Sequence, residues 1–259
     1  MSSNERLAII LAVLVVIYVV SLRVVLWRFL GPFARKTLVV VTLVVIAWGL
    51  FNSLTRWDRT FWGWLFASNN ELAFGAMMSS LTLMLAGLVA LINAWRPVAL
   101  TARLPWLVLA AAFIFMGLDE YYSIHEASDV WNRLYTFNDV ILVLMGAAIF
   151  AFERDVLVPL FLVIGVGMLG FGGVVLDEFS NEVPISLGVV ELSCTYKTHG
   201  IFCTDLSIIE ELFELGGSTL ILVGFVAYAE KRQSAPRWTV TRRALAALTV
   251  FWMLWMLSH

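Results

Sequence analysis

The sequence predicts an all-α integral membrane protein, a bundle of about eight transmembrane helices. Hydrophobic residues make up 61% of the 259 residues, charged residues only 14%, and the mean hydropathy is +0.90. A soluble domain carries about 25% charged residues. The 11 Trp and 18 Phe residues suit the aromatic belts of membrane proteins. No Ser/Gly-rich linker divides the chain, so we expect residues 1–259 to form one domain.

The predicted helices follow from apolar stretches, because crossing a hydrocarbon core of ~30 Å takes about 20 helical residues. Seven stretches are candidates, at approximately 7–27, 37–54, 71–95, 104–122, 139–152, 156–176 and 208–228. The fifth is short, and we expect snorkelling or burial among its neighbours to extend it. An eighth stretch, 244–258, either spans by using the turn at 240–243 or lies in the interface. Seven spans plus one interfacial helix is therefore the alternative architecture.

The charges predict an orientation. With alternating spans, twelve of the 17 Lys and Arg residues fall on one side of the membrane and five on the other. The positive-inside rule places the first group in the cytoplasm. Sixteen of the 19 acidic residues lie on the opposite side, since only Glu153, Asp155 and Glu230 share the basic side. We therefore expect the N-terminus and most acids to be extracytoplasmic.

The two cysteines, Cys194 and Cys203, lie in one predicted extracytoplasmic loop at about 179–206. Disulfides persist in oxidising compartments, so this placement favours a Cys194–Cys203 bridge. Two free thiols, or a pair of ligands for a soft metal, are the alternatives.

The most unusual feature is a set of acids where predicted helices meet water. Asp119 and Glu126 share one helix face with Tyr122 and Ser123, and His125 lies at the edge of that face. Carboxylates with one imidazole suit Zn, Mn, Mg or Ca. Solvated charges at a helix end are the simpler interpretation.

Helix dipoles strengthen the metal hypothesis. Asp119-Glu120 and Asp177-Glu178 each end a predicted helix, where the dipole disfavours negative charge. Glu211 and Glu214 open a later helix, whose dipole favours them, and Glu210 fits a capping box. We expect these three helix ends to converge on one outer pocket. The predicted ligands of a divalent metal there are Asp119, Glu126, Asp177, Glu211 and Glu214.

The predicted function is cation or metal binding in an outward-facing acidic pocket. A metal-dependent membrane hydrolase is a further expectation, in which Glu120 or His125 acts as the general base on a metal-bound water. The alternatives are a non-catalytic subunit of a larger membrane complex and a proton or cation carrier. Lipid is the expected partner, with other membrane subunits in the accessory case.

Several functions are excluded by what the sequence lacks. All three histidines lie at predicted outer ends or loops, so a bis-His haem is not expected. There is no phosphate-binding glycine loop followed by Lys, which argues against a nucleotide, and no basic patch for nucleic acid. The glycines between Gly165 and Gly173 lie in a predicted span, where we interpret them as helix-packing residues.

Two motifs carry a family resemblance. The first is Phe113-x-x-x-Gly-Leu-Asp-Glu-x4-His125-Glu126, and the second is Glu210-Glu211-x-x-Glu214-x-x-Gly217. Together they resemble a group of uncharacterised bacterial multi-pass membrane proteins, which implies a bacterial cytoplasmic (inner) membrane location. A more distant similarity is to the seven-helix hydrolases related to alkaline ceramidase. The chain lacks their histidine-rich late helix, so the resemblance implies no three-histidine zinc site.

Overall fold

The computed structural model describes residues 20, 26–55, 74–96, 99–122, 124, 130–176, 185–186, 191–192, 202–233 and 235–258. Seven α-helices lie within them: α2 (Pro32–Thr55), α4 (Phe74–Ala94), α5 (Leu100–Tyr122), α6 (Val130–Glu153), α7 (Leu157–Gly170), α9 (Phe202–Arg232) and α10 (Ala235–Ser258). A 3-10 turn, η2 (Trp27–Phe29), precedes α2, and a π-helical turn, η4 (Phe171–Leu176), continues α7. Two short antiparallel strands, β1 (Ile185–Ser186) and β2 (Glu191–Leu192), complete the described elements.

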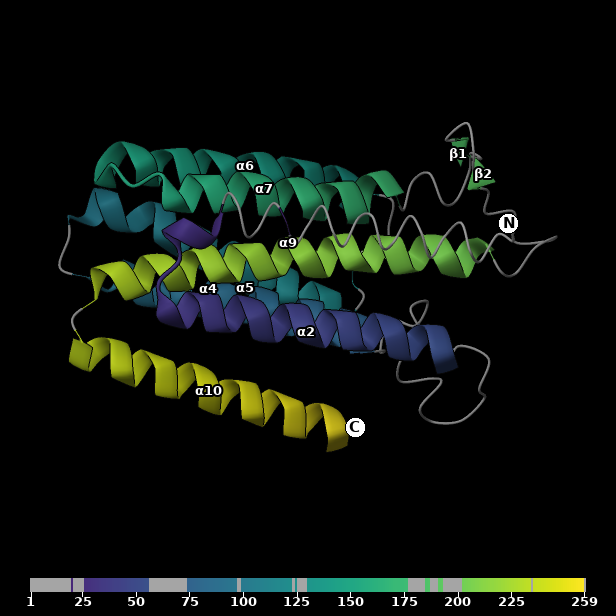
Figure 1. The fold of residues 1–259 in the computed structure, drawn as a ribbon. Helices are drawn as coiled ribbons and strands as arrows, with labels where there is room; N and C mark the ends of the chain where they lie inside the picture. Colours follow the sequence, from purple (N-terminus) through teal and green to yellow (C-terminus); the bar gives the residue numbers. More distant parts are fainter. Residues whose placement is uncertain are drawn as a thin grey trace.

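The helices lie side by side with their long axes roughly aligned (Figure 1). Helices α4, α6 and α9 end on the left of that view, while α2, α5 and η4 end towards the right. Three described segments are long and apolar enough to cross a membrane: Phe74–Ala94, Leu100–Tyr122 and Ile209–Arg232. Leu157–Gly173 is apolar but shorter. The protein is therefore an all-helical bundle with membrane-type helices.

Helix α9 is the centre of the bundle, because every described residue from Leu215 to Ala229 is buried. It packs against α4 on one side and α7 on another. Close approach depends on glycine: a Cβ at Gly217 would lie 2.5 Å from the carbonyl oxygen of Gly165 in α7. Small residues at such contacts are typical of membrane helices. The predicted packing role of Gly165 is thereby confirmed.

Helices α2, α6, α9 and α10 are longer than the predicted stretches, and α6 and α10 differ most at their starts. The fifth stretch, predicted at 139–152, is part of the 24-residue α6, which begins nine residues earlier at Val130. The eighth, predicted at 244–258, is part of α10, which begins at Ala235 and continues without a turn through 240–243. Both predictions started the helix where a polar stretch gives way to an apolar one. Arg has a high helix propensity, so a polar residue indicates where an apolar stretch begins and not where the helix does.

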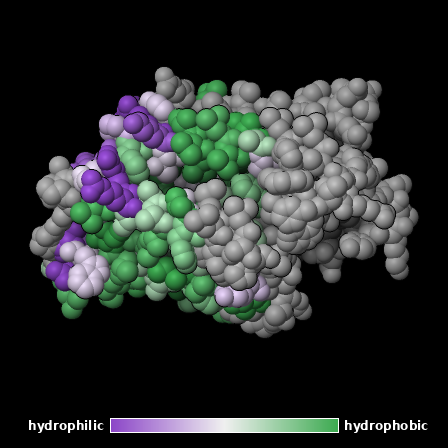
Figure 2. Space-filling view, turned by 90° about the horizontal axis from the view of Figure 1, so that it is seen from below, coloured by the Kyte–Doolittle hydropathy of each residue, from purple (hydrophilic) through white to green (hydrophobic). Residues whose placement is uncertain are grey.

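Helix α10 stays attached to the bundle mainly near its start. Trp238 and Leu245 are buried, and the Trp238 ring packs edge-on against Phe33 at 5.3 Å between centroids. Further along, Val250 and Phe251 are exposed, and α10 diverges from the other helices in Figure 1. In Figure 2, hydrophilic residues gather towards one end of the molecule and hydrophobic residues cover the adjacent surface.

Candidate functional site

The centre of the candidate site is Asp119, near the end of α5. Its side chain has no exposed surface, and the hydroxyl of Tyr135 in α6 donates a hydrogen bond to its Oδ2 atom. Tyr135 can reach Asp119 because α6 begins at Val130 and runs alongside the last turn of α5. Sequence reasoning missed Tyr135, since it placed this residue in a loop before the fifth span.

Two further carboxylates lie close to the same phenol. Glu120 in α5 and Glu214 in α9 are near enough to the Tyr135 hydroxyl to interact with it electrostatically, as is Asp119. The end of α5, the start of α6 and the early turns of α9 therefore meet at one end of the bundle. Asp119 and Glu214 therefore act on the same phenol, whereas Asp177 lies outside the described residues, and the convergence of the three helix ends on one pocket stays a prediction.

The glycines that follow Gly167 make room for acidic side chains. A Cβ at Gly170 would lie 2.8 Å from Oδ2 of Asp139 in α6, and a Cβ at Gly173 would lie 2.6 Å from Oε1 of Glu214. A Cβ at Gly172 would lie 3.0 Å from the Cγ atom of the same glutamate. The glycines thus allow close helix packing, as predicted, and at Gly170 and Gly173 the neighbouring atoms belong to acidic side chains. Gly172 and Gly173 lie in the π-helical turn η4, a feature that is frequent at functional sites.

Glu211 lies one turn before Glu214, against α4 and α2. A Cβ at Gly75 would lie 2.7 Å from Oε2 of Glu211 and 3.0 Å from Cζ2 of Trp48. A side chain at position 75 would therefore displace the Glu211 carboxylate or crowd the Trp48 ring. We call the end of the bundle that carries Asp119, Glu120, Asp139, Glu211 and Glu214 the acidic end.

The described side chains in the helix turns of the acidic end are either acidic or uncharged. Among the described side chains in its helix turns (44–48, 74–80, 115–122, 134–142 and 209–216) there is no Lys or Arg. Within the described part of the chain, no group of three or more His, Cys, Asp or Glu side chains is arranged to hold a metal ion. The predicted ligands Glu126 and Asp177, and the predicted base His125, lie outside that part. Glu120 is described and half-buried.

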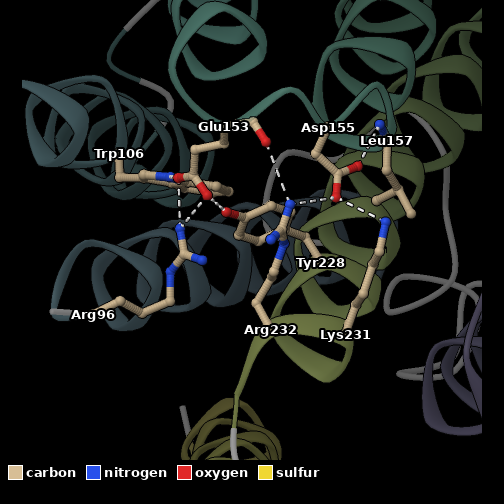
Figure 3. Close-up of polar contacts among 8 residues, drawn as sticks. All are labelled: Arg96, Trp106, Glu153, Asp155, Leu157, Tyr228, Lys231 and Arg232. Atoms are coloured by element: carbon tan, nitrogen blue, oxygen red, sulfur yellow. Dashed lines mark hydrogen bonds and ion pairs between the residues drawn. The ribbon is translucent and has the colours of Figure 1, made fainter. Parts of the chain in front are cut away.

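The opposite end of the bundle carries a network of paired charges (Figure 3). Glu153, at the end of α6, accepts hydrogen bonds from Arg96 Nη2 at 2.5 and 2.7 Å and from the indole nitrogen of Trp106 at 3.1 Å. The hydroxyl of Tyr228 in α9 donates to the same carboxylate. Arg96 also lies over the Tyr228 ring, 4.7 Å from its centroid. One carboxylate thus joins α4, α5, α6 and α9.

Asp155 forms the second half of this network. It accepts hydrogen bonds from Lys231 Nζ at 3.0 Å, from Arg232 Nη2 at 3.4 Å and from the backbone N–H of Leu157 at 3.1 Å. Burial alone would raise the pKa of Asp155, but these hydrogen bonds and the two positive charges outweigh it and lower the pKa below its usual value. This carboxyl therefore stays ionised at neutral pH.

Glu230 is paired in a different way, with backbone groups. Its two carboxylate oxygens accept the N–H groups of Phe33 at 3.0 Å and Ala34 at 3.2 Å, so it caps the first turn of α2 from another helix. A carboxylate at this position also complements the helix dipole. All three acids that the sequence placed on the basic side therefore have a specific structural partner, which the sequence did not reveal.

Comparison with protein families gives one match. Residues 60–229 match the family described as "Domain of unknown function (DUF8692)". The match covers more than half of the chain and includes α4 to α9, so the chain belongs to this family. No curated protein and no solved structure matches the chain.

The predicted disulfide joins two cysteines whose side chains lie outside the described part of the chain. Cys194 lies outside the described residues, and Cys203 belongs to the first turn of α9, where only the backbone is described. The disulfide stays a prediction.

Proposed function

We propose that this protein is a multi-pass membrane protein that binds a cation at the acidic end of its helical bundle. The observation that carries the proposal is the fully buried Asp119, which is held by a phenol and has Glu120 and Glu214 close to that phenol. Burying an ionised carboxylate without a positive charge costs several kcal/mol. A bound cation, in addition to the contacts that these side chains already make, is a counter-charge that suits such an oxygen-rich set.

The chemistry of the side chains favours a hard divalent cation. Carboxylate oxygens suit Mg²⁺, Ca²⁺ or Mn²⁺, and Zn²⁺ also accepts carboxylate with imidazole. Asp119 and Glu214 are the described ligands that we propose. Glu211 lies one turn away, and the predicted ligands Glu126 and Asp177 would complete the shell. A catalytic role for Glu120 and His125 is a prediction that goes beyond cation binding.

Cation binding is favoured over cation transport by the buried face of α9. At the acidic end this face carries Glu211, Glu214 and Ser218, and at the other end it carries Tyr228. Thr219 follows Ser218, and the other residues between Ser218 and Tyr228 are apolar, with Phe225 fully buried. These positions are ten residues apart, or about 15 Å at helical rise. The described residues therefore offer no continuous polar route along α9.

The proposed topology places the acidic end outside the cell and the network around Glu153 in the cytoplasm. Contacts gather Arg35, Arg96, Lys231, Arg232 and Arg242 at the network end, which supports this orientation by the positive-inside rule. Eight spans in a bacterial inner membrane, with the Cys194–Cys203 bridge outside, complete the proposal. Helices α2, α6 and α10 each have 24 residues, about 36 Å at helical rise.

Thermal unfolding with and without a chelator tests the proposal. Chelation should lower the melting temperature of the purified wild type, because repulsion and desolvation of the acids are then uncompensated. Glu214→Gln should reduce this shift, since it removes one charge and one ligand. Asp155→Asn is the matched control, because its carboxylate is at the other end, and it should keep the full shift. If the chelator affects none of the three proteins, the acids need no cation, and pairing with basic residues of a partner subunit replaces the proposal.

A further inference from the structure

A buried indole next to the acidic end has an unused hydrogen-bond donor. Trp48 in α2 is 1% exposed, and among the described residues its Nε1 atom has no hydrogen-bond partner. Trp106, equally buried, donates its Nε1–H to Glu153. Buried polar groups are paired in the great majority of cases, so a buried N–H that the described residues leave unpaired points to an acceptor outside them, such as a bound group.

The surroundings of Trp48 define what that group must be. The Trp48 ring and the Glu211 carboxylate both abut Gly75, where a Cβ would lie 3.0 Å from Trp48 Cζ2 and 2.7 Å from Glu211 Oε2. An indole N–H only donates, so its partner must accept. A carboxylate has about four acceptor positions and repels anions, so the same partner should be neutral and able to donate.

A buried hydroxyl lies on the face of α4 that carries Gly75. Ser79 is one helical turn from Gly75, is 1% exposed, and its Oγ atom has no described partner. Farther along this face, the hydroxyl of Thr82 donates a hydrogen bond to the Oγ atom of Ser218 in α9 at 2.7 Å. The Ser79 hydroxyl has no such bond to a described residue of α9. Ser79 can donate or accept, so it adds a third contact for the same bound group.

We propose that Trp48, Ser79 and Glu211 form a binding site for a single neutral hydroxyl group between α2, α4 and α9. The hydroxyl oxygen accepts the Trp48 N–H, its hydrogen is donated to Glu211, and Ser79 completes the contact. Water and a membrane-soluble alcohol both present this chemistry. The site shares the acidic end with the cation proposed beside Asp119, but its three hydrogen bonds do not require that cation.

The sign of a stability change tests the site. Deleting a buried polar group that is truly unpaired stabilises a protein, whereas deleting one that has a partner destabilises it. We therefore expect Ser79→Ala and Trp48→Phe each to lower the melting temperature of the purified full-length protein, by at least about 2 °C. Because both residues would contact one hydroxyl, the double variant should lose less than the sum of the two. Trp106→Phe, which removes a donor with a known partner, is the positive control.

Two further measurements separate the outcomes. Thr219→Val removes another fully buried hydroxyl that has no described partner, and it should leave the melting temperature unchanged or raise it. Exhaustive delipidation identifies the source: if the effects of Ser79→Ala and Trp48→Phe vanish, the hydroxyl belongs to a lipid alcohol, and if they persist, it belongs to water. A Ser79→Ala variant at least as stable as the wild type would overturn the proposal, because the hydroxyl would then be unpaired. Strictly additive losses in the double variant would also overturn it, because the two residues would then act through packing alone.

Discussion

The charge network around Glu153 should be a main source of stability at its end of the bundle. Arg96 and Glu153 are 12% and 10% exposed, and the carboxylate accepts hydrogen bonds from Arg96, Trp106 and Tyr228. Breaking a buried ion pair costs about 3–5 kcal/mol, because the remaining charge keeps no partner. Glutamine preserves the shape and one acceptor oxygen, and the pair has some access to water. We therefore expect Glu153→Gln to lower the free energy of unfolding by about 3 kcal/mol.

Asp155→Asn is the matched comparison, since it removes a carboxylate two residues away. The Asp155 side chain is only 3% exposed, but its partners Lys231 and Arg232 are 60% and 37% exposed, so water can solvate the two cations that the substitution leaves behind. Exposed pairs contribute about 0–1 kcal/mol, and we expect a loss near 1 kcal/mol. The assay is unfolding in mixed micelles, followed by circular dichroism as a denaturing detergent is added. Equal losses for the two variants, or a smaller loss for Glu153→Gln, would refute the reasoning that burial of the remaining cation sets the magnitude.

The pH dependence of this comparison has a defined sign. The folded pKa of Asp155 is lowered from its ordinary value of 3.8, so its stabilising effect is present above that value and is lost as the pH falls through the folded pKa. The stability difference between wild type and Asp155→Asn should therefore be constant near neutrality. It should shrink below about pH 3.8, and a difference that persisted in full acid would contradict the assigned contacts.

Five other substitutions test three local features of the fold. Glu230→Ala should lower the free energy of unfolding by about 1–2 kcal/mol, because it removes the cap of α2. Gly31→Ala should lower it by a similar amount, because its Cβ would collide with the Glu230 carboxylate. The double variant should be no less stable than either single variant. Arg154 has a φ of 54°, so Arg154→Gly should leave stability unchanged or raise it by up to about 1 kcal/mol, measured by the same detergent titration. Gly173→Ala should lower the free energy of unfolding by about 1–3 kcal/mol, because the new Cβ would displace Glu214. Gly167→Ala is the control and should leave stability unchanged, since a Cβ there would meet nothing within 4 Å. Equal effects of the two substitutions would contradict the role given to the π-helical turn.

The helices were predictable to the extent that apolar length defines them. The stretches predicted at 71–95 and 104–122 correspond to α4 and α5 within a few residues, since apolar composition runs along almost their whole length. The starts of α6 and α10 were not predictable in this way. Polar residues near Arg133 and Arg242 belong to helices that continue beyond the apolar stretch, and hydropathy has no signal for such an extension.

The candidate site was predictable only where one helix end carries several acids. Asp119 and Glu214 stood out because they lie in apolar helices, and the structure brings their helix ends together. Tyr135 and Asp139 were missed because the sequence analysis began the fifth span at Asp139, although their four-residue spacing places them on one helix face. The partners of Glu153 and Glu230 could not be derived, because the residues in contact are 57 to 197 positions apart in the chain.

Counting bound metal tests the central claim most directly. The purified wild type would be dialysed against a buffer containing Mg²⁺, Ca²⁺, Mn²⁺ and Zn²⁺, and the metal retained per chain would be measured by mass spectrometry. Cation binding at the acidic end predicts about one ion per chain in the wild type and in Asp155→Asn, with loss of that ion in the Asp119→Asn, Glu214→Gln double variant. A wild type that retains no ion, or a folded double variant that retains as much as the wild type, would contradict the account.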